Sequence, residues 1–167
     1  MKKEMVIVVL IMVFLVSLSS VGEARFYIGG MYARQLEHDA PGTSWLGITL
    51  RSLGNGLFGS DLDFRFHSGD YMGEDYFLLR INPFLHLNLK LGQLNLYGGI
   101  SPFTVQYLSH GEGEWDFDFH LFYAKAGAQY DFGPLGVFAH GLNRLELDDI
   151  EGSLRQMGLE FGAAIGF

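Results

Sequence analysis

Polar and apolar residues alternate along most of this chain, and the pattern is clearest in its last segment. Between Met157 and Phe167 every second residue is apolar, and the residues between them are polar or small. Residues 75–90 repeat the pattern, with leucines on one face and Arg80, Asn82 and His86 on the other. Because successive side chains of a strand point to opposite faces, the pattern predicts β-strands with one apolar and one polar face.

Glycine, asparagine, aspartate and serine divide the chain into strand-like segments. There are eight of them: Phe26–Leu36, Ser44–Ser52, Phe58–His67, Asp75–Lys90, Leu94–Leu108, Asp116–Asp131, Leu135–Leu147 and Ser153–Phe167. Bacterial membrane barrels have an even number of strands, and about 9–11 residues per strand suffice to cross lipid. The count and the lengths therefore fit a membrane barrel.

A soluble sandwich or lipocalin-like barrel would show the same alternation with its apolar face turned inward. Two features favour lipid outside. Glycine and alanine are common on the polar face, which suits a crowded interior. Aromatic residues also gather near segment ends, as in the two girdles of a membrane barrel. We expect one girdle of Trp45, Tyr71, Tyr76, Tyr107 and Trp115, and a second of Phe58, Tyr97, Tyr130, Phe132 and Phe167.

The amino terminus has the three-part layout of a secretory signal peptide. Lys2 and Lys3 precede an apolar run from Met5 to Val16, and a small, polar stretch follows as far as Ala24. The run is too short for a membrane-spanning helix, which needs about 20 residues. We expect residues 1–24 to be cleaved and residues 25–167 to form the barrel. The chain has no cysteine, which excludes a lipoprotein anchor, a disulfide framework and cysteine-based sites.

The carboxyl terminus carries a motif. Glu160, Gly162, Ile165 and Phe167 are similar to the assembly signal of outer-membrane proteins. The whole mature chain resembles the small eight-stranded outer-membrane barrels of the OmpA-domain, OmpX and Ail type. The resemblance implies an all-β, eight-stranded antiparallel up-and-down transmembrane β-barrel in the outer membrane of a Gram-negative bacterium. It implies contact with outer-membrane lipid, lipopolysaccharide and the assembly machinery. We expect a monomer without a cofactor.

Two segments do not keep their phase. In residues 116–131, Lys125 would cost about 2–4 kcal/mol at the lipid midplane. We therefore expect a β-bulge near Leu121–Tyr123, which turns Lys125 inward. The fifth segment is ambiguous at Pro102, and Pro83 lies on its neighbour. Each proline removes a donor from the ladder of hydrogen bonds, so this pair predicts a local weak point.

The net charge of −8 comes mostly from acids in four predicted outer loops. These loops are Glu37–Thr43, Ser68–Glu74, Ser109–Trp115 and Asp148–Gly152. Their charge fits two interpretations, either the solubility of exposed loops or bridging by divalent cations to lipopolysaccharide phosphates. His110, Glu112, Glu114 and Asp116 alternate and form a candidate metal site. Nucleic-acid binding is excluded, because the chain is acidic and has no basic patch.

The basic residues lie within segments, on the predicted inner face. We expect Arg51, Arg65, Arg80, Lys125 and Arg144 to pair with Asp63, Glu146 and Glu160 in a lumen network. An eight-stranded barrel is just wide enough for its own side chains. Such pairs would plug the lumen, and the alternative is a narrow pore.

Three stretches have residue types suited to acyl transfer. His67 lies beside Ser68 and near Asp70, Ser109 lies beside His110, and His140 stands alone on the seventh segment. Lipid A deacylases of the PagL type carry His-x-Ser, but Leu142 occupies the serine position here. We therefore expect a structural, envelope-integrity or surface-interaction role. A lipid A acyl hydrolase or acyltransferase and a small adhesin remain alternatives.

Overall fold

The computed structural model describes residues 25–36, 43–53, 57–71, 74–109, 113–118, 121–146 and 157–167. The predicted signal peptide, residues 1–24, lies outside these ranges, as do most residues of the predicted outer loops. No helix in the described part of the chain has the length and hydropathy required to cross a membrane.

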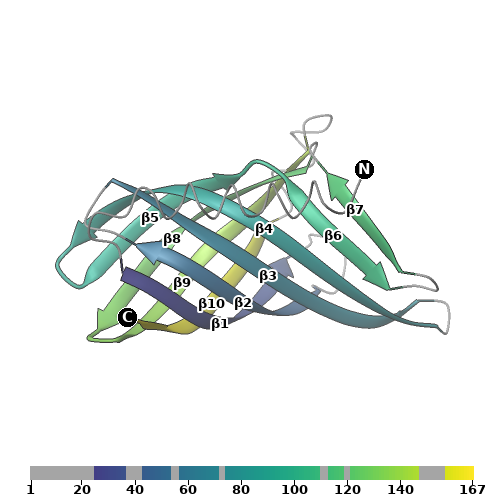
Figure 1. Ribbon diagram of the computed structural model, residues 1–167, viewed down its shortest axis with the longest axis horizontal. Coiled ribbons are helices and arrows are strands. Elements are labelled where there is room, and N and C mark those ends of the chain that lie inside the picture. Colours follow the sequence, from purple (N-terminus) through teal and green to yellow (C-terminus); the bar gives the residue numbers. More distant parts are fainter. Residues whose placement is uncertain are drawn as a thin grey trace.

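One antiparallel sheet contains all the described strands. They are β1 (Arg25–Leu36), β2 (Ser44–Leu53), β3 (Phe58–Tyr71), β4 (Glu74–Leu91), β5 (Leu94–Ser101), β6 (Thr104–Ser109), β7 (Glu114–Asp118), β8 (Leu121–Phe132), β9 (Leu135–Glu146) and β10 (Met157–Gly166). β1 pairs with both β2 and β10, and pairing of β3 with β4 closes the ring. Eight strands, all except β6 and β7, therefore form a closed barrel (Figure 1). The predicted fold is confirmed.

The two ends of the barrel differ. At one end, which we call the terminal end, the backbone of Phe26 bonds to that of Phe167. The side chain of Arg25 also donates to the carbonyl of Gly133, in the β8–β9 turn, over 3.1 Å. The β3–β4 hairpin extends to the opposite end, which we call the loop end. Gly92 and Gly133 have positive φ angles of 66° and 70°, the region that tight hairpin turns require of glycine.

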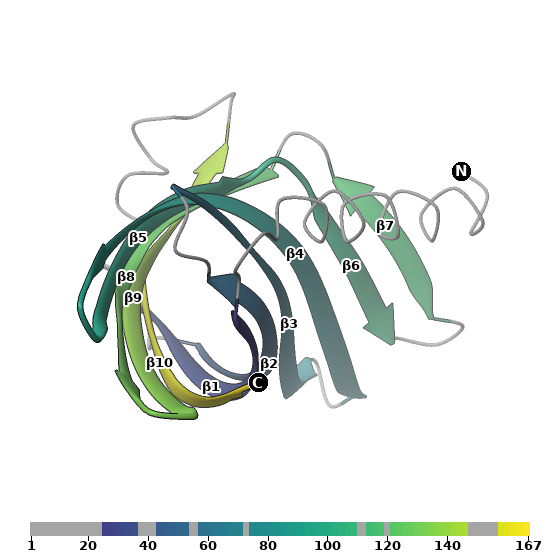
Figure 2. The same ribbon diagram turned by 60° about the vertical axis from the view of Figure 1, so that its left-hand side comes forward.

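The fifth and sixth predicted segments are each divided into two strands. The fifth becomes β5 and β6, with the break at Pro102 and Phe103, where proline cannot donate to the ladder. β6 pairs with the first half of β4, and β7 pairs with β6. Figure 2 shows the β6–β7 hairpin bending away from the closed part of the wall.

The expected change of phase occurs in this region. Gln106 and Asp116 lie on the same face as Arg80, which places Trp115 and Phe117 on the outer face. In β8, however, the odd-numbered residues Tyr123 and Lys125 are buried. The phase therefore differs between β7 and β8, and the predicted position of the change, Leu121–Tyr123, is at the start of β8.

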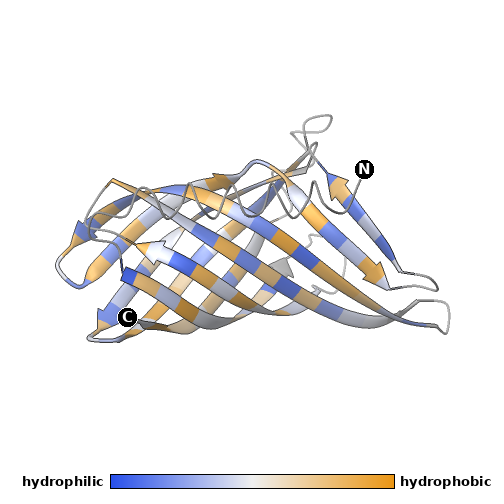
Figure 3. Ribbon diagram, viewed as in Figure 1, coloured by the Kyte–Doolittle hydropathy of each residue, from blue (hydrophilic) through white to orange (hydrophobic). Residues whose placement is uncertain are grey.

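The barrel has its apolar face outside. Figure 3 shows hydrophobic and hydrophilic residues alternating along the strands. Leu46 and Ile165 have exposed fractions of 66% and 63%, whereas Asp63 and Glu160 have 0% and 1%. This distribution reverses that of a soluble protein and matches a strand wall with lipid outside.

The girdle prediction is wrong for three residues. Trp45 and Tyr97 have exposed fractions of 6% and 5% and face the lumen. Tyr76 lies against His67, and its hydroxyl is 2.9 Å from Nε2 of that ring. Lumen and lipid faces can both hold aromatic rings, so position near a segment end did not identify the face. Phe58, Tyr130, Phe132, Phe167 and Trp115 are exposed as expected.

Candidate functional site in the barrel lumen

A buried aspartate, Asp61, lies at the centre of one half of the lumen. Arg51 Nε donates to its Oδ1 over 3.0 Å, and His86 Nε2 is also 3.0 Å from that oxygen. Lys125 Nζ donates to Asp61 Oδ2 and, over 3.1 Å, to Asp63 Oδ2. The side chains of Arg51, Asp61 and Lys125 are fully buried. Sequence reasoning missed Asp61, although it shares the inner face of its segment with Asp63.

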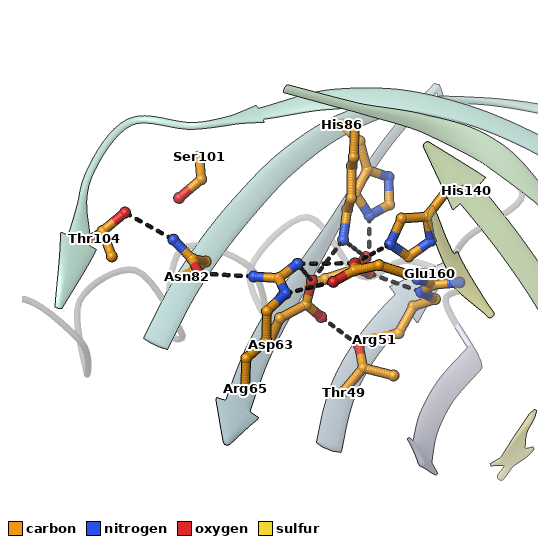
Figure 4. A network of polar contacts seen from close by, with 12 residues as sticks. Thr49, Arg51, Asp63, Arg65, Asn82, His86, Ser101, Thr104, His140 and Glu160 are labelled. Carbon is orange, nitrogen blue, oxygen red and sulfur yellow. Dashed lines mark hydrogen bonds and ion pairs between the residues drawn. The ribbon is translucent and has the colours of Figure 1, made fainter. Parts of the chain in front are cut away.

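Arg65 forms the other half of the network, with Glu160 on the opposite wall (Figure 4). Its Nε donates to Glu160 Oε1 over 2.5 Å and its Nη2 to Oε2 over 2.9 Å, so the pair is bidentate. Nη2 also donates to Asp63 over 3.1 Å, and Nη1 donates to Asn82 over 2.7 Å. Bidentate arginine–carboxylate pairs are among the strongest charge-assisted hydrogen bonds.

Aromatic and histidine side chains join the two halves. The hydroxyl of Tyr97 accepts from Arg51 Nη1 over 3.1 Å and lies 2.9 Å from His140 Nδ1. His140 Nε2 is 2.5 Å from Glu160 Oε2. The guanidinium of Arg51 also stacks on the ring of Phe138, 4.4 Å from its centroid. The network therefore runs without a break across the width of the lumen.

An apolar cluster fills the lumen nearer the terminal end. It consists of Tyr27, Met31, Leu53, Phe138 and Ala164, all buried. The hydroxyl of Tyr27 donates to Asp131, which also accepts from Asn95 and Gln129. Side chains thus occupy the lumen on both sides of the Asp61 group.

Two predicted members of the network lie elsewhere. Arg80 makes its described contacts with neutral groups: it donates to Gln106 over 3.0 Å and to the Tyr123 hydroxyl over 3.4 Å, and it stacks on Trp45. Arg80 and Arg144 line a cavity of about 40 Å³ towards the loop end. Glu146 was also expected to join the lumen network, and its side chain is not among those that the structure describes.

Solved structures similar to this chain are small barrels. Neisserial surface protein A matches with a TM-score of 0.57 and 10% identity, over 86% of this chain and 95% of that one. Ail of Yersinia pestis, crystallised with the heparin analogue sucrose octasulfate, gives 0.54 and 14%, over 87% and 98%. The N-terminal barrel of Pseudomonas aeruginosa OprF gives 0.55 and 11%, over 87% and 100%. This is the fold of the small outer-membrane β-barrels. No family model matches the sequence. No curated protein matches it either.

One group in this barrel has the composition of a metal site. Ligand atoms of Asp63, His140 and Glu160 lie within 4.8 Å of one another. Their oxygens accept hydrogen bonds from the cations Arg65 and Lys125, however, so the carboxylate charge is already matched. The donor set fits a salt-bridge network better than a divalent cation. Of the candidate metal ligands in the sequence, Glu114 and Asp116 lie exposed on β7, and His110 and Glu112 fall outside the described residues.

The catalytic candidates are not arranged for nucleophilic catalysis. His67 Nδ1 is 2.9 Å from the carbonyl of Ser44, and its Nε2 contacts Tyr76, so both ring nitrogens have partners. Ser68 follows on the opposite face of β3 and is exposed. His140 contacts Tyr97 and Glu160, and no serine of the described chain bonds to it.

The terminal motif divides between the two faces of β10. Glu160 and Gly162 point to the lumen, where an added Cβ at Gly162 would lie 2.7 Å from Cζ of Phe138. Ile165 and Phe167 point outward, with exposed fractions of 63% and 73%. The outward pair is accessible to another protein or to lipid, whereas the lumen pair is committed to packing.

Proposed function

We propose that this chain is an outer-membrane β-barrel of a Gram-negative bacterium that does not conduct and that supports the envelope by contacts at its loop end. The observation that carries the proposal is a buried network of ion pairs that crosses the lumen. Three cations, Arg51, Arg65 and Lys125, contact three carboxylates, Asp61, Asp63 and Glu160.

These contacts link walls that are far apart in sequence. Arg65 and Glu160 are separated by 95 residues, and Lys125 and Asp61 by 64. An ion would have to break pairs whose removal leaves a charge buried, at a cost of about 3–5 kcal/mol each. The apolar cluster around Phe138 adds a second obstruction. The geometry supports a closed lumen more than a narrow pore.

For the loop end, we propose contact with lipopolysaccharide through divalent cations. Glu114 and Asp116 are exposed on β7, and the predicted outer loops hold further acids. Ca²⁺ and Mg²⁺ prefer carboxylate and phosphate oxygens, so they can bridge such acids to the phosphates of the outer leaflet. We expect a surface role of this kind and no lipid A chemistry.

Fractionation and conductance test this proposal. We expect the protein in the outer-membrane fraction, with a different gel migration in unheated and heated samples. The purified barrel should show no conductance steps in planar bilayers. Recovery as a soluble periplasmic protein would refute membrane insertion. Stable conductance steps would favour the pore. A changed lipid A mass on overexpression, lost in His67→Ala or His140→Ala, would favour the enzyme.

The contact with lipopolysaccharide needs its own measurement. In vesicles that contain lipopolysaccharide, the outer loops should be protected from protease, and this protection should depend on Mg²⁺. Chelation of Mg²⁺ should abolish the protection. Charge reversal at Glu114 and Asp116 should weaken it, and protection unaffected by chelation would contradict the bridging model.

A further inference from the structure

The loop end of the lumen differs in charge from the rest. Deeper in the barrel each buried cation has a carboxylate partner, but the cavity of about 40 Å³ is lined by four arginines and one acid. The arginines are Arg34, Arg65, Arg80 and Arg144, and the acid is Glu160. Glu160 is already held by Arg65 through both of its oxygens. Among the described residues that line the cavity, cations therefore outnumber anions.

Arg80 shows this excess most directly. Within the described chain its guanidinium contacts a carboxamide, a phenol and an indole, all neutral. The charges of Arg144 and Arg65 act on it as unfavourable neighbours. Desolvated cations are stable when an anion satisfies them. A negatively charged group in the cavity would relieve the repulsion among the three arginines.

The cavity limits the size and shape of that group. A water molecule needs about 10–15 Å³ of such space, so the cavity suits a group of a few heavy atoms. Its arginines come from β1, β3, β4 and β9, and so approach from several sides. A planar carboxylate is bound best by one guanidinium in its own plane, whereas a tetrahedral phosphoryl group offers oxygens in several directions. Trp45 and Tyr123 complete the wall.

The wall of the barrel is interrupted beside this cavity. Arg80 lies on β4 opposite Gln106 of β6, and Tyr123 lies on β8 opposite Ser101 at the end of β5. Beyond Ser101, no pairing joins β6 to β8 in the described ranges. Figure 2 shows the β6–β7 hairpin leaning away from the rest of the wall. The backbone hydrogen bonding of the wall is therefore discontinuous beside the cavity in the described part of the chain.

We propose that the arginine-lined cavity is a binding site for a phosphoryl group, held by Arg80 and Arg144 with Arg34 and Arg65 beside them. The group belongs either to a phosphorylated lipid or to a free phosphate. The site extends the proposed surface role. It depends neither on the acidic loops nor on the absence of conductance.

Calorimetry of the full barrel in an amine-oxide detergent, which contains no phosphate, tests the site. Inorganic phosphate and dodecyl phosphate are titrated separately, with sodium chloride at matched ionic strength as the blank. We expect saturable binding that Arg80→Gln and Arg144→Gln each weaken about tenfold or more, since each change removes a charge-assisted hydrogen bond to the phosphoryl group. Arg25→Gln, at the terminal end, is the matched control and should leave binding unchanged.

The two probes separate the sources of the phosphoryl group. Dodecyl phosphate binding at least about tenfold tighter than phosphate, with the same dependence on Arg80, would indicate a lipid headgroup, because only the lipid-like probe can also bury an alkyl chain. Equal affinities would indicate a free phosphate. Trp45 emission in a Trp115→Phe background should change with the same saturation, because Trp45 lines the cavity.

Folding of each variant is checked by its migration on unheated gels. If Arg80→Gln does not fold, Arg34→Gln replaces it, because Arg34 is exposed and its loss leaves no buried group unpaired. Absence of saturable binding of either probe, or binding that survives all the arginine substitutions, would overturn the proposal. Conductance and fractionation are measured separately, so their failure is distinct from failure of this site.

Discussion

Substitution of Lys125 by methionine distinguishes a lysine in the lumen from a lysine that faces lipid. The two arrangements predict changes of opposite sign in the free energy of unfolding. The lysine side chain is fully buried, donates to Asp61 and Asp63, and lies 3.9 Å from the centroid of the Phe84 ring. Lys125→Met keeps the length of the side chain but leaves two carboxylates without their shared cation. Breaking a buried pair in this way costs about 3–5 kcal/mol.

The opposite result is expected if Lys125 faces lipid. A lysine at the lipid midplane destabilises a barrel by about 2–4 kcal/mol, so its replacement by methionine would then be stabilising. A loss of 3–5 kcal/mol instead lowers the ratio of folded to unfolded protein by about two to three and a half orders of magnitude. The two arrangements therefore differ in sign and not merely in size.

Urea titration of the barrel in phosphatidylcholine vesicles measures the free energy of unfolding, with gel migration and tryptophan emission as readouts. Lys90→Met is the control, because Lys90 is exposed near the terminal end, and its effect should stay within about 0.5 kcal/mol. Combining Lys125→Met with Asp61→Asn should be less destabilising than the two changes added together, because the double variant restores the balance between cations and carboxylates in the network. Additive effects, or any gain in stability from Lys125→Met, would refute the network.

Three further measurements test other parts of the fold. Gly127→Ala should destabilise the barrel by about 1–3 kcal/mol, because its added Cβ would collide with the facing β9 backbone. Gly98→Ala should be nearly neutral in the same urea titration, because the atom nearest to its added Cβ is 3.8 Å away. Brominated lipids should quench the fluorescence of Trp115 far more than that of Trp45, because the two side chains are 50% and 6% exposed. The measurement uses the two single-tryptophan variants, and equal quenching would contradict the assigned faces. Phe167→Ala should reduce assembly in cells. It should change the unfolding free energy of the refolded protein by no more than about 1 kcal/mol, because the ring is 73% exposed. Unchanged assembly would argue against the terminal signal.

Alternation alone was enough to predict most strands and their faces. Each period-two segment has one apolar face, and a chain with so many of them can hide its backbone from lipid only by closing the sheet. Leu159, Phe161 and Ile165 point outward as their spacing predicts. The exceptions are local: Pro102 divides one segment and the phase differs between β7 and β8, at the two places where the pattern was weak.

Tertiary structure decided which inner residues meet. Period two gives the face of a residue but not its height in the barrel, which depends on the register of every strand pair around the ring. That register puts Arg65 against Glu160 and Lys125 against Asp61, while Arg80 is left among neutral groups near the loop end. The sequence by itself determined a barrel with its polar residues inside. Only closure of the sheet determined which charges are matched and where positive charge is left over, because pairing across a lumen depends on distance in space and not on spacing along the chain.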